Sequence, residues 1–394
     1  MHHAMTTINT PKGIVRFVEE LLSQADIRTD GQRPHDIRIH SDQFFDAVLS
    51  RWSLGLGESY MDGHWDCSAL DECIARLLSI DLDERIRGTA RLRAAMAVLR
   101  SRIFNLQRPR RAFQVADAHY NLDNDLFRQM LDSRMIYSCA YWERASTLEQ
   151  AQLDKLDLIC QKLDLKPGER LLDIGSGWGG LAAHAARYYG AHVVGLTVSR
   201  EQKAYADQVC RGLPVEIRLQ DYRDLNECFD KVVSVGMFEH VGDKNYPAYF
   251  RCVHKALRPQ GIFLLHTIGS RSTTTSTDPW IDKYIFPNGK IPSVTEITRA
   301  IEGNWVLEDW QNFGQDYDKT LMAWHRNIAN ALPELSQRYE QRFLRMWSYY
   351  LLSCAGYFRS RKGQLWQLVL TKPERRHPYR SIRIRRIRDM LFSA

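Results

Sequence analysis

The sequence predicts an α/β fold in which a parallel sheet is covered by helices on both faces, preceded by a small mixed α+β domain. Short apolar strands alternate with helical patterns from residue 151 onward, which is the spacing of βαβ units. A glycine-rich turn joins the first of these strands to a helix. Before residue 106, helical periodicity is combined with a short alternating stretch, which indicates a separate, smaller domain.

The composition is that of a globular protein large enough for more than one core. The chain has 394 residues, of which 44% are hydrophobic and 26% charged, and this excludes disordered and collagen-like classes. No run approaches the roughly 18 apolar residues that a membrane-spanning helix needs, and the first thirty residues contain no continuous apolar core of a signal peptide. We therefore expect a cytoplasmic protein with two or three domains.

Cysteine spacing argues against a metal centre. The eight cysteines form no CxxC pair and no matched histidine spacing, so we expect reduced thiols and no metal site. They are Cys67, Cys73, Cys139, Cys160, Cys210, Cys228, Cys252 and Cys354.

Positive charge is concentrated in two segments. Residues 84–111 hold nine arginines against one acid, and residues 371–394 hold eight lysines or arginines against two acids. Because the whole chain has a net charge of only +7, the remainder is acidic. Such segments attract polyanions, either nucleic acid or an anionic lipid surface.

The first third of the chain predicts a small domain over residues 1–105. Apolar residues at helical spacing predict an amphipathic helix over 11–27, and alternation predicts a strand over 36–40. Ser68 begins a capping-box pattern that would open a helix over 69–79. A basic amphipathic helix over 85–104 follows, with a solvated or a membrane-facing role.

A basic linker over 106–118 is expected to lead into a catalytic domain over 119–394. Within that domain an aromatic-rich insertion near 270–325 interrupts the alternation and predicts a cap or a substrate-binding wall. The periodicity predicts helices over 151–163 and 181–189, and strands over 170–174, 192–196, 215–219, 231–235, 261–266 and 365–371.

The glycine-rich turn after the first strand is the main candidate for a cofactor site. Gly175, Gly177 and Gly179 let the backbone approach a ligand at the start of a helix. The dinucleotide pattern GxGxxG is not met, because the third glycine comes one residue early. Asp173, just before the glycines, suits a cofactor with a cationic amino-acid end, which favours S-adenosylmethionine over NAD. A structural turn without a ligand is the alternative.

Strings spread in order through nearly the whole chain resemble the cyclopropane-fatty-acyl-phospholipid synthases, which are related to the mycolic acid cyclopropane synthases. The resemblance implies a class I S-adenosylmethionine-dependent methyltransferase fold with a Rossmann-like sheet. Ser176 departs from the family, which usually has cysteine between the first two glycines. The strings are residues 55–63, 120–122, 124–127, 137–142, 235–242, 265–269, 284–289, 316–318 and 354–359.

The resemblance also implies the reaction and its site. A methylene group would pass from S-adenosylmethionine to the cis double bond of a phospholipid acyl chain, with bound bicarbonate as proton acceptor. The family positions that hold the bicarbonate correspond here to Glu239, His266, Tyr317, Cys139 and the carbonyl of Ile268. A carboxylate beside bicarbonate requires either a shared proton or a cationic His266.

Taken singly, each of these side chains has a plainer interpretation. A histidine after a buried strand, a tyrosine among aromatics and a single cysteine are more often parts of a core. Cys354 has no necessary role as a nucleophile in direct transfer, so we expect it to line the pocket. Phe238, Tyr246, Trp280, Tyr284, Phe286, Phe313 and Trp324 are weak candidates for an acyl channel.

Matching family positions also imply the contacts to the cofactor. Asp221 has a second interpretation, as the cap of a helix. The implied cofactor-binding residues are Tyr137, Ser138, Asp173, Gly175, Ser176, Gly177, Gly179, Thr197, Gln202, Gln220 and Asp221.

The implied partner is a phospholipid bilayer, with the basic segments on anionic head groups at the inner face of the membrane. The resemblance further implies a homodimer. A nucleic-acid methyltransferase is the main alternative, but residues 236–240 lack the Asn/Asp-Pro-Pro-aromatic string that base-amino methyltransferases often carry after the fourth strand. A small-molecule methyltransferase and a non-catalytic lipid-surface protein are further alternatives.

Overall fold

The computed structural model describes residues 12–80 and 124–382, which form two compact units. We call residues 124–275, 288–320 and 363–382 the sheet unit, and residues 12–80, 276–287 and 321–362 the helical unit. The helix predicted over 85–104, the linker over 106–118, the string at 120–122, the whole basic segment 84–111 and residues 383–394 of the second basic segment lie outside the described residues.

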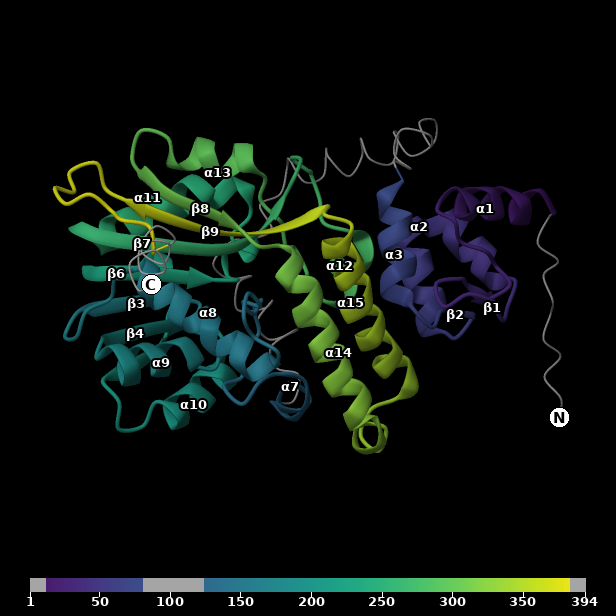
Figure 1. Ribbon diagram of the computed structural model, residues 1–394, viewed down its shortest axis with the longest axis horizontal. Coiled ribbons are helices and arrows are strands. Elements are labelled where there is room, and N and C mark those ends of the chain that lie inside the picture. The colour runs from purple at the N-terminus through teal and green to yellow at the C-terminus, as the bar shows by residue number, and fades with distance from the viewer. Residues whose placement is uncertain (1–11, 81–123, 383–394) are drawn as a thin grey trace, which may run out of the picture. The chain divides into compact units, whose positions relative to one another are not determined.

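A seven-stranded sheet forms the centre of the sheet unit (Figure 1). Its strand order is β5-β4-β3-β6-β7-β9-β8. The first five strands in that order are parallel, and β9 runs antiparallel to both β7 and β8. The strands are β3 (Arg170–Ile174), β4 (His192–Thr197), β5 (Val215–Leu219), β6 (Phe229–Val235), β7 (Leu257–Ser270), β8 (Val306–Asn312) and β9 (Gly363–Thr371).

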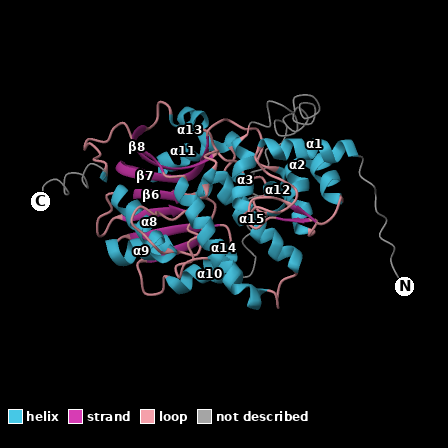
Figure 2. Ribbon diagram, turned by 45° about the vertical axis from the view of Figure 1, so that its right-hand side comes forward, coloured by secondary structure: helices cyan, strands magenta, loops and turns pink. Residues whose placement is uncertain are grey.

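Helices cover both faces of this sheet (Figure 2). Alternate residues of β3 and β4 belong to different cores. Leu171 and Val193 pack with α8, α9 and α10, while Leu172 and Val194 pack with α11 and α13. This is the two-sided burial expected of parallel strands. The helices of the sheet unit are α7 (Asn124–Met130), α8 (Leu148–Lys162), α9 (Gly180–Tyr189), α10 (Arg200–Val209), α11 (Tyr246–Ala256), α13 (Val294–Ile301) and the 3-10 turns η1 (Tyr222–Asp224), η2 (Phe238–His240) and η3 (Asp243–Asn245).

The predicted α/β fold is confirmed, with an addition inside the aromatic-rich insertion. The strands predicted over 170–174 and 215–219 have those bounds, and the predicted helix over 181–189 is α9. The insertion, however, contributes β8 to the sheet edge and α13 to one face. This part of the insertion is thus built into the sheet and one of its faces, whereas the sequence predicted a cap or a substrate-binding wall.

The helical unit contains one short two-stranded sheet among helices. Ser68 does not form the predicted capping box: α3 has Ala69 at its N-cap position, and no side chain caps it. The elements are α1 (Lys12–Gln24), β1 (Arg38–Ile39), α2 (Gln43–Met61), β2 (Trp65–Asp66), α3 (Leu70–Ser79), α12 (Pro279–Tyr284), α15 (Gln341–Arg359) and the part of α14 (Gln315–Leu335) from residue 321.

This unit groups segments that the sequence assigned to the catalytic domain with the N-terminal segment. In α15, Arg359 Nη1 lies 2.6 Å from Asp71 Oδ2 of α3. A Cβ added to Gly356 would lie 2.5 Å from the backbone oxygen of Asp71, so only glycine lets these two helices approach so closely. Residues 276–287 and 321–362 therefore group with residues 12–80, a division that differs from the predicted boundary at residue 119.

Hydropathy within the described parts of the chain gives no transmembrane candidate. Over residues 12–80 and 124–382, every helix is too short or too polar to cross a bilayer.

Candidate functional site

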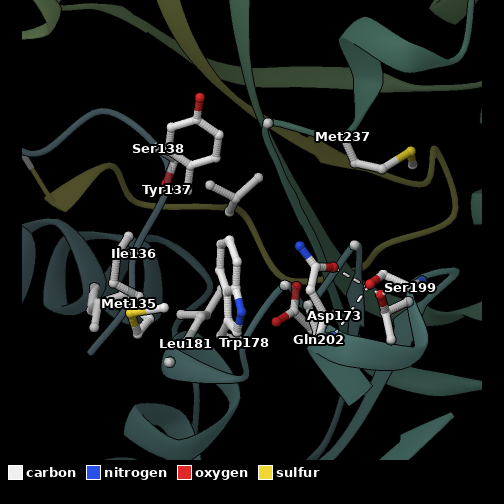
Figure 3. Close-up of a pocket in the computed structure, with 18 of the residues that line it drawn as sticks. Met135, Ile136, Tyr137, Ser138, Asp173, Trp178, Leu181, Ser199, Gln202 and Met237 are labelled. Atoms are coloured by element: carbon white, nitrogen blue, oxygen red, sulfur yellow. Dashed lines mark hydrogen bonds between the residues drawn. The ribbon is translucent and has the colours of Figure 1, made fainter. Parts of the chain in front are cut away.

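A cavity of about 150 Å³ lies at the carboxyl ends of β3 and β4 in the sheet unit (Figure 3). Ligands of open α/β sheets bind at this edge. Its lining residues all fall between positions 135 and 237. The cavity gathers these predicted cofactor-binding residues: Tyr137, Ser138, Asp173, Gly175, Ser176, Gly177, Thr197 and Gln202.

The three glycines of the turn have different roles. All three have positive φ, from +53° to +87°. A Cβ on Gly177 would meet nothing within 4 Å, whereas a Cβ on Gly175 would lie 2.7 Å from Met237 Cβ. A Cβ on Gly179 would lie 2.9 Å from Ala206 Cβ on α10. Gly177 therefore keeps space open at the cavity, while Gly179 is needed for helix packing and does not line the cavity.

Asp173 ends in this cavity without a hydrogen-bond partner for its Oδ2 atom. The residue is 2% exposed, and burial raises the pKa of its carboxyl to about 7, although Lys155 acts in the opposite direction. Sequence reasoning missed Lys155, which also lines the cavity and is 1% exposed. The signal was available, because Lys155 lies at helical spacing from Leu148, Ala151 and Ile159, all of them buried.

The segment Tyr137–Ser138 is held against α8. Lys155 Nζ donates to Ser138 Oγ at 2.8 Å, and Gln152 Nε2 donates to the Ser138 carbonyl at 2.9 Å. Tyr137 packs edge-on against Phe127 of α7, with ring centroids 5.2 Å apart. These contacts fix one wall of the cavity.

Two further cavity residues are positioned by α7 and by the β4–α10 turn. Trp178 Nε1 donates to Asn124 Oδ1 at 2.9 Å. Thr197 Oγ1 donates to Gln202 Oε1 at 3.0 Å, which ties the end of β4 to the first turn of α10. The glycine-rich turn and the turn that follows β4 are thus both anchored.

Gln220 and Asp221 do not line the cavity. The side chain of Asp221 accepts from the backbone N–H of Arg223 at 2.9 Å and caps η1, and its carboxylate also pairs with the Arg223 guanidinium. Gln220 Nε2 donates to the carbonyl of Asp224 at 3.1 Å. The cap interpretation of Asp221 therefore describes its contacts here, and the adenine-binding roles of both residues stay predictions.

A second cluster lies next to the cavity, where β6 pairs with β7. Val235, which lines the cavity, is in register with His266. Glu239 follows two residues after the cavity residue Met237, and its Oε1 accepts from the backbone N–H of Ile268 at 2.7 Å. The strand pairing thus places Glu239 against Ile268, two residues after His266, and the catalytic roles expected of the three residues stay predictions.

Polar atoms of this cluster are buried without partners. Glu239 Oε2 and His266 Nε2 are inaccessible to solvent and have no hydrogen bond to any described residue. His266 is 1% exposed, and its Nδ1 lies 3.2 Å from Gln367 Nε2. Because the Gln367 amide donates to Nδ1, the ring proton is placed on Nε2. Unpaired buried groups of this kind indicate a place for a ligand.

Burial shifts the pKa values of Glu239 and His266 so that both side chains favour their neutral forms. It raises the pKa of Glu239 to about 7 and lowers the pKa of His266 well below its usual value. Lys155 and Lys162 lower the pKa of His266 further. Of the two alternatives for holding an anion here, a shared proton on Glu239 therefore agrees with these surroundings better than a cationic His266.

Cys139 lies on a loop that is hydrogen-bonded to the first two turns of α14. Thr320 Oγ1 accepts from Ala140 N–H at 3.1 Å and lies 3.8 Å from Cys139 Sγ. Asp316 Oδ2 accepts from the N–H of Trp142 at 2.9 Å. Tyr317 follows Asp316 on α14, and its predicted place beside Cys139 stays a prediction. Burial raises the pKa of the Cys139 thiol well above its usual value.

Cys354 lies on α15 in the helical unit. Burial raises the pKa of its thiol to about 12, which agrees with a neutral, non-nucleophilic side chain. Its predicted place at the pocket stays a prediction. Of the proposed channel aromatics, Phe238 and Tyr246 stack on each other in the core of the sheet unit, and Trp280 and Trp324 are fully buried.

Comparison with known proteins finds relatives along most of the chain. Residues 107–368 match the model of the mycolic acid cyclopropane synthetase family. The cyclopropane-fatty-acyl-phospholipid synthase of Escherichia coli K12 is 54% identical over 357 residues, which are 91% of this chain and 93% of that protein. A probable fatty acid methyltransferase of Pseudomonas putida is 40% identical over 268 residues, 65% of this chain and 68% of that protein.

Solved structures agree with the sequence relatives. The cyclopropane synthase MmaA2 from Mycobacterium tuberculosis matches with a TM-score of 0.63 and 33% identity, covering 66% of this chain and 98% of that one. Mycolic acid cyclopropane synthase CmaA1, complexed with SAH and CTAB, matches with a TM-score of 0.61 and 33% identity over the same shares of the two chains.

Substituting alanine at two glycines of the turn should separate binding from stability. We expect Gly177→Ala to weaken binding of S-adenosylhomocysteine at least about tenfold, because its methyl group enters the cavity, while positive-φ strain costs about 1 kcal/mol. We expect Gly179→Ala to lower the free energy of unfolding by about 2 to 4 kcal/mol through strain and overpacking against Ala206. Calorimetric titration and urea denaturation measure the two effects. Equal losses of affinity in both variants would contradict the division of roles.

Glu239 should make stability depend on pH. Its folded-state pKa, about 7, lies above the ordinary 4.5, so the folded state keeps a proton that the unfolded state releases between these values. The free energy of unfolding of the native protein relative to Glu239→Gln should therefore fall by about 3 kcal/mol as the pH rises from 4.5 to 8. Urea denaturation of both proteins across this range measures it. A difference independent of pH would show that Glu239 ionises normally.

Proposed function

The chain belongs to the mycolic acid cyclopropane synthetase family, and on this basis we propose that it transfers a methylene group from S-adenosylmethionine to the cis double bond of an unsaturated phospholipid acyl chain. The products are the cyclopropane acyl chain and S-adenosylhomocysteine. The observation that carries the proposal is the pair of water-excluded, unpartnered atoms, Glu239 Oε2 and His266 Nε2, beside the cofactor cavity.

The reaction needs orientation and dryness. An alkene is a weak neutral nucleophile, so the sulfonium methyl group and the double bond must be held in line. Formation of the first carbon–carbon bond leaves positive charge on the acyl chain, which water would trap. A proton must then leave the new methyl group so that its electron pair closes the ring. These steps require a cavity for the cofactor next to a buried proton acceptor.

The residues beside the cavity fit bicarbonate as that acceptor. Its negative charge is complementary to the N–H of a neutral His266 and to the O–H of a protonated Glu239, both of which are donors. The carbonyl of Ile268 accepts from Thr267 Oγ1 at 3.1 Å and has a second lone pair for a hydroxyl group. Tyr317 and Cys139 would complete the set. When bound, bicarbonate supplies the base for the proton of the methyl group.

In this proposal, Glu239 and His266 hold the proton acceptor in place. The bond from Ile268 N–H fixes one oxygen of Glu239, which leaves the other to face the anion. Gln367 fixes the tautomer of His266. Phe313 packs against His266, with ring centroids 5.8 Å apart, and adds an aromatic surface beside the dry cluster.

Mass spectrometry of lipids tests the proposed reaction. Vesicles of unsaturated phospholipid incubated with the protein, S-adenosylmethionine and bicarbonate should gain one CH₂ per reacted chain and lose the olefin. Glu239→Gln and His266→Ala should lower turnover by at least about 100-fold while changing S-adenosylhomocysteine affinity less than about threefold. Methylated nucleic acid with unchanged lipid would overturn the proposal, as would equal losses of turnover and affinity.

We further propose that the protein associates peripherally with anionic phospholipid head groups through its two basic segments, residues 84–111 and 371–394. Each basic side chain near the surface contributes on the order of 1 kcal/mol at physiological salt. Sedimentation with anionic vesicles should fall as salt rises, and also after arginine-to-glutamine changes in both segments. Binding that is indifferent to salt and to these changes would contradict the proposal.

A further inference from the structure

We propose that Lys155 binds the α-carboxylate of the methionine end of S-adenosylmethionine, while Asp173 binds its α-ammonium group. This inference rests on the proposed function and deepens it, because it names the side chains that hold the charged end of the cosubstrate. The lysine would be a specificity-determining residue for ligands that carry a carboxylate.

The first argument is that Lys155 is a buried cation that forms no close ion pair with any residue the structure describes. It lies on α8, is 1% exposed and lines the cavity. Asp132 and Asp173 attract this charge from a distance, but among the described residues no carboxylate oxygen lies within 4.0 Å of its Nζ, and its hydrogen bond goes to the neutral Ser138 hydroxyl. Fully buried lysines are rare unless they are paired, so this charge calls for an anion.

The second argument is that an unpaired acid lines the same cavity. Asp173 is 2% exposed and its Oδ2 has no partner. Burial lowers the pKa of Lys155 to about 8 and raises the pKa of Asp173 to about 7, which shows that neither charge is well stabilised by the protein alone. A ligand whose end carries one ammonium and one carboxylate group neutralises both.

Ser138 adds a donor for the same carboxylate. Because its Oγ accepts from Lys155, its own hydroxyl proton points elsewhere, and no described residue is found to accept it. The Ser138 carbonyl is held by Gln152, so the residue is fixed beside the cavity. Lys155 and Ser138 together present two donors, which suits the two oxygens of a carboxylate.

The competing explanation is that Lys155 only holds the loop at Ser138 in place. Two cosubstrates that differ by one group separate these roles. S-adenosylmethionine has the carboxylate, and decarboxylated S-adenosylmethionine lacks it but keeps the ammonium group. A loss of loop structure would weaken both ligands equally, whereas a lost carboxylate contact weakens only the first.

Calorimetric titration of the full-length protein with both ligands is the test. Lys155→Met should weaken S-adenosylmethionine roughly 10- to 100-fold and decarboxylated S-adenosylmethionine less than about twofold. Asp173→Asn should weaken both, and should leave 5′-methylthioadenosine, which lacks both charged groups, nearly unchanged. Lys162→Met is the matched control, because Lys162 is equally buried on α8 but does not line the cavity. It should change neither affinity.

Equal weakening of both ligands by Lys155→Met, or no weakening of either, would overturn the proposal. If that variant does not fold, Lys155→Gln, which keeps a donor for Ser138 without the charge, replaces it and is judged by the same outcomes. The test uses no lipid. Failure of the protein to alter phospholipids would therefore overturn the proposed function and leave this inference standing. If the protein alters phospholipids but Lys155→Met does not discriminate between the two ligands, only the inference is overturned.

Discussion

The pairing of β6 with β7 is the interaction on which the arrangement of the site depends. Val235 lies opposite His266, and the N–H of Gly236 donates to the carbonyl of His266 at 2.9 Å. This register sets Glu239, on the turn after β6, against the backbone of Ile268. A slip of one residue would turn His266 to the other face of the sheet and remove it from the cluster. Main-chain hydrogen bonds between β6 and β7 therefore fix the positions of Glu239 and His266.

Exclusion of water from this cluster changes the pKa values of its titratable side chains. Burial raises the pKa of Glu239 and lowers that of His266, so both side chains favour their uncharged, hydrogen-bond-donating forms. The same effect in the neighbouring cavity leaves Lys155 and Asp173 poorly stabilised by the protein itself. The cavity thus combines an amine and a carboxyl side chain, which supports the proposed zwitterionic ligand, and the adjoining cluster has donors that support the proposed anion.

Periodicity predicted the strands β3 and β5 because buried parallel strands are short, apolar and bounded by turns. It missed β8, whose Val306 and Leu307 are exposed at the sheet edge and whose burial does not alternate. The make-up of the helical unit could not be predicted from local sequence patterns, because three separated segments build it through contacts such as that of Gly356 with Asp71. Family resemblance supplied Glu239 and His266, whereas Lys155 was missed because a helical lysine is usually solvated.

The position of β9 has a consequence for how activity is acquired during synthesis. This last strand inserts between β7 and β8, both of which precede it in the chain, and it carries Gln367, the partner of the His266 ring. Every residue that lines the cofactor cavity, by contrast, has been translated by position 237. A nascent chain therefore contains all the residues that line the cavity well before Gln367, the partner of the His266 ring, has been added. The residues of the cavity are therefore synthesised first, and the strand that orients His266 is synthesised last.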